Sequence, residues 1–285
     1  MARVLLVGCG RLGLAVAKLL HKKDHSVTGL RRDISQLPDY ITGISADITK
    51  PKTLQQLQLM TFEYIVVATT AGEFNDAAYR RTYVDGLANL LAAIAGPVKR
   101  LFLVSSTSVY HQCDGSVVDE QSATLPNHFS GCRQLEAETI ANNGPIASTV
   151  VRFSGIYGPG RYRLIEQVLN HQGGSSELFT NRIHIDDCAA ILVFLLSQCE
   201  NKKSVDSVYI GTDSSPVTMA EIKNWLAVML GVDKNDLIAA KDGARRSSKK
   251  ISNNKLLALG YHFKYPDYKS GYGPVVKNWL DKNKK

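Results

Sequence analysis

The stretch Gly8-Cys9-Gly10-Arg11-Leu12-Gly13 decides how this sequence of 285 residues is interpreted. It follows a short apolar segment, residues 3–7, and precedes a run in which apolar residues recur at helical spacing. A glycine-rich turn between a strand and a helix is the context in which this spacing binds dinucleotides. Gly8 would allow a tight turn, Gly10 would let the backbone approach a pyrophosphate, and Gly13 would let the helix pack closely on the strand. We therefore predict a phosphate-binding turn at the helix N-terminus, formed by Gly8, Gly10, Arg11, Leu12 and Gly13, with a purely structural turn as the alternative.

The end of the second predicted strand bears on the choice of cofactor. This strand, residues 26–30, leads into Arg31 and Arg32, about 20 residues after the glycine turn, where NAD enzymes carry an acidic residue that binds the ribose hydroxyls. Two arginines instead suit the 2′-phosphate of NADP. We therefore predict NADP as the cofactor, with NAD as the alternative. Two solvated arginines after a strand would be the structural explanation.

Apolar segments of strand length alternate with helical patterns through the first half of the chain. The predicted strands are residues 3–7, 26–30, 44–48, 64–68, 100–104 and 148–153. The predicted helices after the first are residues 52–59, 75–95 and 133–142. This alternation predicts an α/β fold, a doubly wound parallel sheet of Rossmann type. Such sheets bind ligands at the carboxyl ends of their strands, where the sequence places Asp47, Thr69 and Ser106.

The regular alternation ends after residue 153. An apolar helix is expected after residues 181–187, with Asp186 or Asp187 as its cap. Thr218 is expected to cap a later helix, because Glu221 stands in the capping-box position. We predict a cofactor-binding domain over residues 1–157 and a smaller substrate lobe built mainly from residues 158–285, with residues 183–196 returning to the first domain.

The composition is that of an ordinary globular protein. Hydrophobic residues make up 44% and charged residues 21% of the chain, and no apolar run approaches the roughly 18 residues of a membrane helix. The five cysteines are scattered without metal-ligand spacing. This pattern predicts reduced thiols in a cytoplasmic protein that has no metal site and does not enter a membrane.

The basic charge is concentrated at the end of the chain. The formal net charge is +8, and residues 241–285 contain 12 basic and 3 acidic side chains. A solvated basic face is one explanation, and a patch for an anionic ligand is the other. The candidates for holding a phosphate there are Arg245, Arg246, Lys249 and Lys250. Nucleic acid is not expected as a partner, because the sequence shows no recognised nucleic-acid motif.

Further segments make the sequence resemble the extended short-chain dehydrogenases/reductases of the NAD-dependent epimerase/dehydratase family. These segments are Ala46-Asp47-Ile48, Val104-Ser105-Ser106-Thr107-Ser108-Val109-Tyr110, Val118-Asp119-Glu120, residues 152–160 and His184-Ile185-Asp186-Asp187. The resemblance implies that Asp47 and Ile48 lie near the adenine and that the cofactor is lined by Ala68, Thr69, Thr70 and Ala71. It also implies that the Ser106 hydroxyl bonds to the substrate.

The same resemblance implies the substrate class and the assembly. The substrate would be a nucleotide-linked sugar or a similar small anion. A homodimer would form through the helices predicted at residues 75–95 and 133–142. Dehydratase chemistry is not expected, because Thr107 and Ser108 replace the acidic pair of the dehydratases.

The sequence departs from the family at the catalytic base. The family uses the Tyr of a Tyr-x-x-x-Lys motif, but alignment on residues 135–138 places Ser130 and Gln134 at these positions, and a shift by one residue gives Phe129 and Arg133. A lysine and a cationic nicotinamide lower the pKa of a tyrosine from about 10 toward the working range. A serine hydroxyl is far too weak an acid for this task, and positioned acid–base catalysis is typically worth about 10²–10⁴-fold.

Two hypotheses about function therefore follow. The first is an NADP-linked oxidoreductase or epimerase with an atypical site, in which Ser106, Ser130 and Gln134 occupy the catalytic positions. The second is a catalytically silent protein that binds NADP as a sensor or as a partner of another protein. The candidates for a substitute proton donor are Tyr83, Tyr110, His128, Tyr157 and His184, each of which could equally serve packing.

Overall fold

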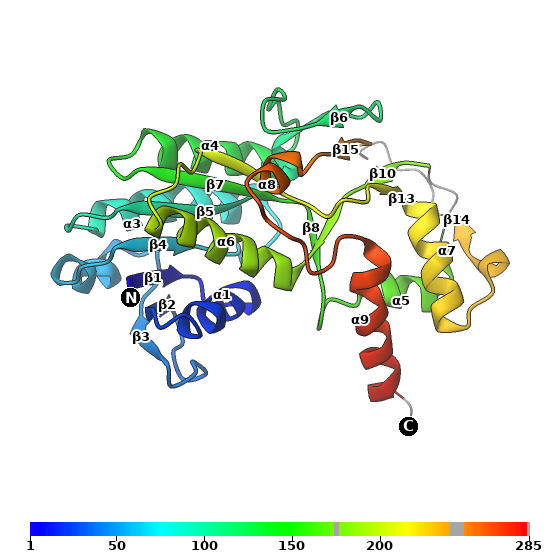
Figure 1. The fold of residues 1–285 in the computed structure, drawn as a ribbon, viewed down its shortest axis with the longest axis horizontal. Coiled ribbons are helices and arrows are strands. Elements are labelled where there is room, and N and C mark those ends of the chain that lie inside the picture. Colours follow the sequence, from blue (N-terminus) through cyan, green and yellow to red (C-terminus); the bar gives the residue numbers. More distant parts are fainter. Residues whose placement is uncertain (174–176, 240–247, 284–285) are drawn as a thin grey trace. The chain divides into compact units, whose positions relative to one another are not determined.

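The computed structural model describes residues 1–173, 177–239 and 248–283 as two compact units (Figure 1). Unit 1 comprises residues 1–110, 123–153 and 188–209, and unit 2 comprises residues 111–122, 154–187 and 210–285. Neither unit is one continuous stretch, because the chain passes between them several times. The predicted division into a cofactor domain and a substrate lobe concerns ligands and stays a prediction. Within the described residues, no helix is long and apolar enough to cross a bilayer.

Unit 1 is built on a seven-stranded sheet with the order β12-β7-β5-β4-β1-β2-β3. Its strands are β1 (Arg3–Val7), β2 (Ser26–Arg31), β3 (Ile41–Ser45), β4 (Tyr64–Val67), β5 (Arg100–Ser106), β7 (Ser148–Phe153) and β12 (Val208–Gly211). Parallel pairing joins β3 to β2, β2 to β1, β1 to β4, β4 to β5 and β5 to β7. The order of the strands reverses at β1, as in doubly wound sheets, whose ligand crevice lies at that point. The predicted Rossmann-type fold is confirmed.

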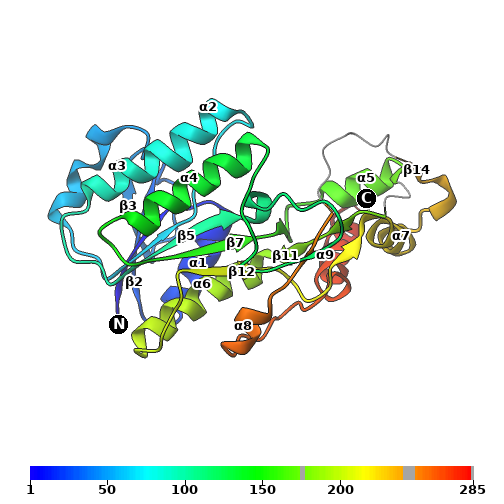
Figure 2. The same ribbon diagram turned by 90° about the horizontal axis from the view of Figure 1, so that it is seen from above.

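Helices cover both faces of this sheet. Figure 2 shows α3 (Gly86–Ala93) and α4 (Phe129–Asn143) over one face and α1 (Arg11–His21) and α6 (Ile185–Glu200) over the other. A continuous apolar cluster joins β1, β4 and β5 to α3 and α4, and its fully or nearly fully buried members include Leu5, Ile65, Leu90, Leu103 and Ala137. Each large apolar side chain buried in this way stabilises the fold by about 1.5–3 kcal/mol.

Two predicted elements of unit 1 end or wind differently. The third strand, predicted at residues 44–48, is β3 at Ile41–Ser45, so residues 46–48 form the turn that follows it. Ala46 and Ile48 are nevertheless buried, which explains why their alternation imitates a strand. The helix predicted at residues 52–59 is a 3₁₀ helix, η1 (Pro51–Leu59).

The long helix predicted over residues 75–95 is divided into three segments. They are α2 (Asp76–Tyr79), a π-helical segment η2 (Arg80–Asp85) and α3. Asn75 caps the first of them by accepting a hydrogen bond from the Ala78 N–H at 2.8 Å. A single π turn inside a helix often marks a functional site, because the extra residue re-aims the side chains on that turn.

The predicted caps differ in outcome. Thr218 Oγ1 accepts a hydrogen bond from the Glu221 N–H at 3.1 Å and caps α7 (Met219–Leu230), which confirms the capping prediction. Helix α6 begins ahead of both aspartates, so the prediction that Asp186 or Asp187 caps it is wrong. His184 takes the capping place, because its Nδ1 accepts a hydrogen bond from the Asp186 N–H at 3.1 Å.

Unit 2 is a small mixed layer of helices and two-stranded sheets. Its helices are α5 (Arg163–Leu169), α7, η4 (Lys234–Asp236), α8 (Asn254–Ala258) and α9 (Tyr268–Asn283). Its strands are β6 (Val117–Val118), β8 (Gly155–Tyr157), β9 (Gln172–Gly173), β10 (Phe179–Thr180), β11 (Arg182–His184), β13 (Val217–Thr218), β14 (Ile238–Ala239) and β15 (Lys250–Ile251). An apolar cluster that includes Ile165, Ile222, Leu226 and Val276 holds α5, α7 and α9 together.

Gly271 gives a test of the packing in unit 2. A Cβ at this position of α9 would lie 1.7 Å from Tyr157 Oη and 2.7 Å from Tyr157 Cζ. We expect Gly271→Ala to lower the free energy of unfolding by about 1–3 kcal/mol, the usual cost of overpacking. Tyr157→Phe should cost little by itself, because the buried Tyr157 hydroxyl has no hydrogen-bond partner among the described residues.

The Tyr157→Phe background should recover part of the loss caused by Gly271→Ala. Denaturant unfolding of the two single variants and the double variant measures this coupling. An equal cost of Gly271→Ala in both backgrounds would contradict the contact.

Candidate functional site

The glycine turn has the geometry that its sequence predicts. Gly8 adopts a φ of +95°, and a Cβ there would lie 2.6 Å from the Ala68 carbonyl oxygen. A Cβ on Gly13 would lie 2.1 Å from the Gly8 carbonyl oxygen, so α1 packs directly on the turn. A Cβ on Gly10 would meet no atom within 4 Å. The turn is therefore closely packed on its inner side and open at Gly10, where a ligand can reach the backbone.

A cleft of about 510 Å³ opens beside this turn in unit 1. It is lined by the ends of four neighbouring strands and by the helical segment that follows β4. Its lining includes these predicted cofactor residues: Gly8, Gly10, Arg31, Arg32, Asp47, Ile48, Ala68, Thr69 and Thr70. Of the other predicted residues, Leu12 and Gly13 are buried in α1, and the Ala71 N–H donates to Tyr83 Oη at 3.3 Å. Arg11 begins α1 at the edge of the turn.

The cleft contains more cationic side chains than the sequence indicated. Arg31 is half-buried and its Nη1 donates to the Cys9 carbonyl oxygen at 3.4 Å, whereas Arg32 is exposed. Arg81 also lines the cleft, from the π-helical segment η2. It was not predicted. Ala78 lines the cleft as well, and the spacing of three residues places Ala78 and Arg81 on one face of a helix.

The acidic side chain of Asp47 in this cleft is held by its own turn. Asp47 accepts hydrogen bonds from the N–H and the hydroxyl of Thr49, at 2.9 and 2.8 Å. Burial works against ionisation of Asp47, but the Thr49 hydrogen bonds together with Arg32 and Lys50 outweigh it and lower the pKa of the carboxyl. Asp47 is therefore a fixed negative charge whose oxygens are partly occupied by its own loop.

The three residues at the predicted catalytic positions belong to β5 and α4. Ser106 ends β5, and its Oγ accepts a hydrogen bond from the Ser108 N–H at 3.1 Å. Helix α4 begins at Phe129, four residues before the predicted start, so Ser130 lies in its first turn. A Cβ on Gly131 would lie 2.2 Å from the Ser108 carbonyl oxygen. This close contact brings the Ser130 turn against the segment that follows Ser106.

Gln134 lies one turn further along α4. It is buried, and its Oε1 has no hydrogen-bond partner among the described residues. Ser130 bonds to the neighbouring His128: its Oγ lies 2.9 Å from His128 Nδ1. Neither side chain supplies the acidic hydroxyl or the charge of a Tyr and Lys pair.

A buried ion pair fixes α4 over the sheet. Arg152 on β7 donates to both carboxylate oxygens of Glu138 on α4, with Nη2 at 2.6 Å from Oε2 and Nε at 3.0 Å from Oε1. Ser105 Oγ donates to the same carboxylate at 2.5 Å, and Arg152 Nη1 donates to Tyr110 Oη at 2.6 Å. Tyr110 is therefore part of this network, because its hydroxyl accepts a hydrogen bond from Arg152.

Three of the other candidates, Tyr83, Tyr157 and His184, are held by packing or by a hydrogen bond. Burial raises the pKa of Tyr83, and its hydroxyl accepts the Ala71 N–H. Burial raises the pKa of Tyr157, whose hydroxyl faces Gly271. Burial lowers the pKa of His184, whose Nδ1 caps α6. Each side chain has a structural role that explains its position.

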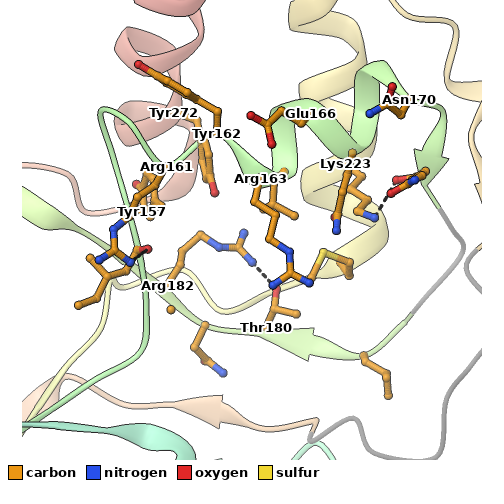
Figure 3. Close-up of a pocket in the computed structure, with 18 of the residues that line it drawn as sticks. Tyr157, Arg161, Tyr162, Arg163, Glu166, Asn170, Thr180, Arg182, Lys223 and Tyr272 are labelled. Atoms are coloured by element: carbon orange, nitrogen blue, oxygen red, sulfur yellow. Dashed lines mark hydrogen bonds between the residues drawn. The ribbon is translucent and has the colours of Figure 1, made fainter. Parts of the chain in front are cut away.

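A second pocket, of about 1180 Å³, lies within unit 2 (Figure 3). Its basic lining side chains are Arg161, Arg163, Arg182, Lys223 and His171. Glu166 is the one acidic side chain among the described lining residues. Arg182 is only 4% exposed. Its Nη2 donates to Thr180 Oγ1, and its Nη1 has no partner among the described residues. The pocket therefore offers a desolvated guanidinium to an anion.

The sequence placed the anion candidates elsewhere. Arg245 and Arg246 lie outside the described residues. Lys249 is buried, which lowers its pKa to about 8, and Lys250 Nζ lies 4.4 Å from the centroid of the Phe179 ring. Among the residues that line the second pocket, only Tyr157 was a candidate from the sequence, as a proton donor.

Comparisons with solved structures agree with this fold. A structure from Methylobacillus flagellatus, assigned to the NAD-dependent epimerase/dehydratases, is 38% identical, with 98% of both chains covered and a TM-score of 0.83. UDP-glucose 4-epimerase from Thermotoga maritima, solved with UDP-glucose, is 17% identical, with 98% and 99% of the chains covered and a TM-score of 0.83. dTDP-glucose 4,6-dehydratase from Bacillus anthracis, solved with NAD, is 18% identical, with 100% and 98% covered and a TM-score of 0.80.

Comparison of the sequence with known families gives the assignment. No curated protein matches the chain. The profile of the NAD dependent epimerase/dehydratase family matches residues 4–211, which is most of the chain and includes the glycine turn, the Ser106 segment and α4. The chain belongs to the NAD dependent epimerase/dehydratase family.

Proposed function

We propose that this protein is an NADP-linked oxidoreductase or epimerase that acts on a nucleotide-linked sugar or a similar anion with an atypical site. The observation that carries the proposal is that arginine side chains line a pocket in each unit. The cleft of unit 1 joins the open backbone at Gly10 to Arg31, Arg32 and Arg81. The pocket of unit 2 presents the buried Arg182.

The residues of the unit 1 cleft fit NADP. The pyrophosphate would bind at the Gly8–Gly10 turn and the N-terminus of α1, where no side chain blocks the backbone of Gly10. The 2′-phosphate would bind Arg31 and Arg32, because a guanidinium matches phosphate oxygens with paired N–H donors. Arg81 adds a third cation to the same cleft. NAD remains the alternative, and it is the cofactor present in the Bacillus anthracis structure.

The substrate would bring its anionic group to the pocket of unit 2. Arg161, Arg163 and Arg182 all line this pocket, and the side chains of Arg163 and Arg182 point toward Thr180 (Figure 3). A phosphate or pyrophosphate oxygen would accept a hydrogen bond from Arg182 Nη1, a buried donor that has no partner among the described residues. The UDP-glucose present in the Thermotoga maritima structure is a molecule of this class.

The chemistry would place Ser106, Ser130 and Gln134 at the reacting end. NADP, when bound, supplies or accepts hydride. Ser106 would bond to a substrate oxygen, since its hydroxyl ends β5 at the carboxyl edge of the sheet. Ser130 lies in the turn of α4 packed on the segment after Ser106. Gln134 is buried and uncharged, so it would shape this end of the site without acting on a proton.

The second candidate function is a catalytically silent NADP-binding sensor or partner protein. It is favoured by the state of α4, where Ser130 is bonded to His128 and Gln134 is buried. Both candidates imply the same cofactor cleft and differ in hydride transfer alone. A cytoplasmic location fits the free thiols of Cys9, Cys113, Cys132, Cys188 and Cys199. A homodimer remains part of the proposal.

Nucleotide titration tests the proposed function. We expect NADPH to bind more tightly than NADH, with a change in nicotinamide fluorescence that reports both. Small carbonyl compounds should then quench the fluorescence of bound NADPH, or UDP-sugars should generate it from bound NADP⁺. Binding without hydride transfer across such a panel would favour the silent candidate. No binding of either nucleotide would overturn both.

The arginines after β2 can be tested separately from the fold. Arg31→Ala and Arg32→Ala should each weaken NADPH binding about tenfold or more and leave NADH binding nearly unchanged, because a hydrogen bond to a charged group is worth about 1.5–3 kcal/mol. Arg80→Ala is the matched control, since Arg80 lies on η2 but does not line the cleft. If the ratio of the two affinities does not change, the NADP assignment is wrong.

Arg182 tests the anion pocket. We expect Arg182→Gln to weaken the binding of UDP, measured by calorimetry, at least tenfold, because the desolvated guanidinium is the strongest donor of the pocket. Lys269→Gln removes the same charge from an exposed position of unit 2 that does not line the pocket. Equal losses in the two variants would show a general effect of charge and would count against the pocket.

A further inference from the structure

The residue that precedes α4 has the geometry of a hydrogen-bond donor at the reacting end. His128 is half-buried, and its Nδ1 lies 3.3 Å from the Ser130 N and 2.9 Å from the Ser130 Oγ. Its Nε2 makes no hydrogen bond with any described residue. It differs from the other candidates of unit 1, Tyr83 and Tyr110, in keeping a polar side-chain atom without a hydrogen bond to a described residue, whereas Tyr157 and His184 belong to unit 2.

The contact with the backbone determines which ring nitrogen carries the proton. The Ser130 N–H can only donate, so His128 Nδ1 must be the acceptor. The Ser130 hydroxyl, at 2.9 Å from the same nitrogen, then donates as well. In a neutral imidazole the other nitrogen must carry the hydrogen. The helix cap therefore selects the tautomer of the neutral ring that carries its proton on Nε2.

The aromatic neighbours of His128 connect it to the cofactor cleft. Gly72 and Glu73 line the cleft, and Phe74 follows them directly in the chain. The Phe74 ring stacks on the His128 ring, with centroids 5.7 Å apart and planes inclined by 18°. His128 also precedes the turn that packs on the segment after Ser106 through Gly131. The imidazole thus lies at the carboxyl end of β5, next to the loop that follows β4.

We infer that His128 donates its Nε2–H to the reacting oxygen of the substrate, in the place that the family gives to a tyrosine hydroxyl; this inference rests on the proposed function. In reduction, the carbonyl carbon accepts hydride from NADPH, and the oxygen gains the electron pair of the C=O π bond. The Nε2–H stabilises the negative charge that develops on this oxygen, and water then supplies the proton. The carbonyl is reduced to an alcohol and NADPH is oxidised to NADP⁺. The reverse reaction returns the proton to water.

Two conservative variants separate this role from helix capping. Asn at position 128 can accept the Ser130 N–H as a cap but has no donor in the place of Nε2. Gln can present an amide N–H close to the place of Nε2 but reaches past the capping position. We expect His128→Asn to keep the fold and NADPH affinity and to lower the single-turnover rate of hydride transfer about 100-fold, as when one oxyanion donor is removed. His128→Gln should unfold more easily and keep more of the rate than His128→Asn.

The probes are NADPH with a small aldehyde and NADP⁺ with UDP-glucose, and the readouts are nicotinamide fluorescence and ¹⁵N-imidazole NMR. The NMR signals of His128, assigned by their loss in His128→Asn, should show the Nε2–H tautomer at pH 8 without any ligand. The Nδ1–H tautomer, or a rate in His128→Asn equal to that of the unmodified protein, would overturn the inference. An unmodified protein that binds NADPH without transferring hydride would also overturn it, in favour of the silent candidate. Absence of NADPH binding would refute the proposed function, whereas the tautomer tests His128 independently.

Discussion

The buried ion pair between Glu138 and Arg152 determines where the first turn of α4 lies on the sheet. Taking these two charges out of water costs several kcal/mol each, and the cost is offset only if their hydrogen bonds are well formed. Here the carboxylate receives Arg152 and the Ser105 hydroxyl, and the guanidinium also reaches Tyr110. Each partner comes from a different element, so α4 cannot slide along β5 and β7 without breaking the network. The first turn of α4 is thereby held at the carboxyl end of the sheet.

Much of the fold could be predicted because its signals are local. The strand at residues 3–7 has the predicted bounds, because a strand buried on both faces reads as a continuous apolar run, here residues 4–7. The glycine turn was predictable because steric limits act between residues close in sequence or on adjacent strands. The third strand was predicted about three residues too late, because local burial was mistaken for a strand pattern. Ala46 and Ile48 are buried in a turn, and burial alone does not distinguish a turn from a strand.

The candidate site was less predictable because its residues meet through long-range packing. Arg81 reaches the cleft from a π-helical segment, and no local pattern announces that change of winding. Arg163 and Lys223 face one pocket although 60 positions separate their numbers in the sequence. The role of His128 depends on where α4 begins, four residues before the predicted start. The motif showed that Ser130 replaces the tyrosine of the family. Only the three-dimensional arrangement shows that His128 lies beside Ser130.

Unit 2 contains two buried charged side chains, Arg182 and Asp213, whose hydrogen bonds are incomplete. Arg182 and Asp213 are both almost fully buried, and the Asp213 N–H donates to the Arg182 carbonyl oxygen at 2.8 Å, yet Arg182 Nη1 and Asp213 Oδ2 each have no hydrogen-bond partner among the described residues. Burial raises the pKa of Asp213 to about 7 against the opposing effects of the Ser215 N–H and Arg182. The carboxyl therefore compensates the guanidinium incompletely at neutral pH. Proteins satisfy nearly all their buried polar groups, and exceptions concentrate where function requires them. Arg182 lines a pocket. An anionic ligand bound there would accept a hydrogen bond from Nη1 and so satisfy the buried donor.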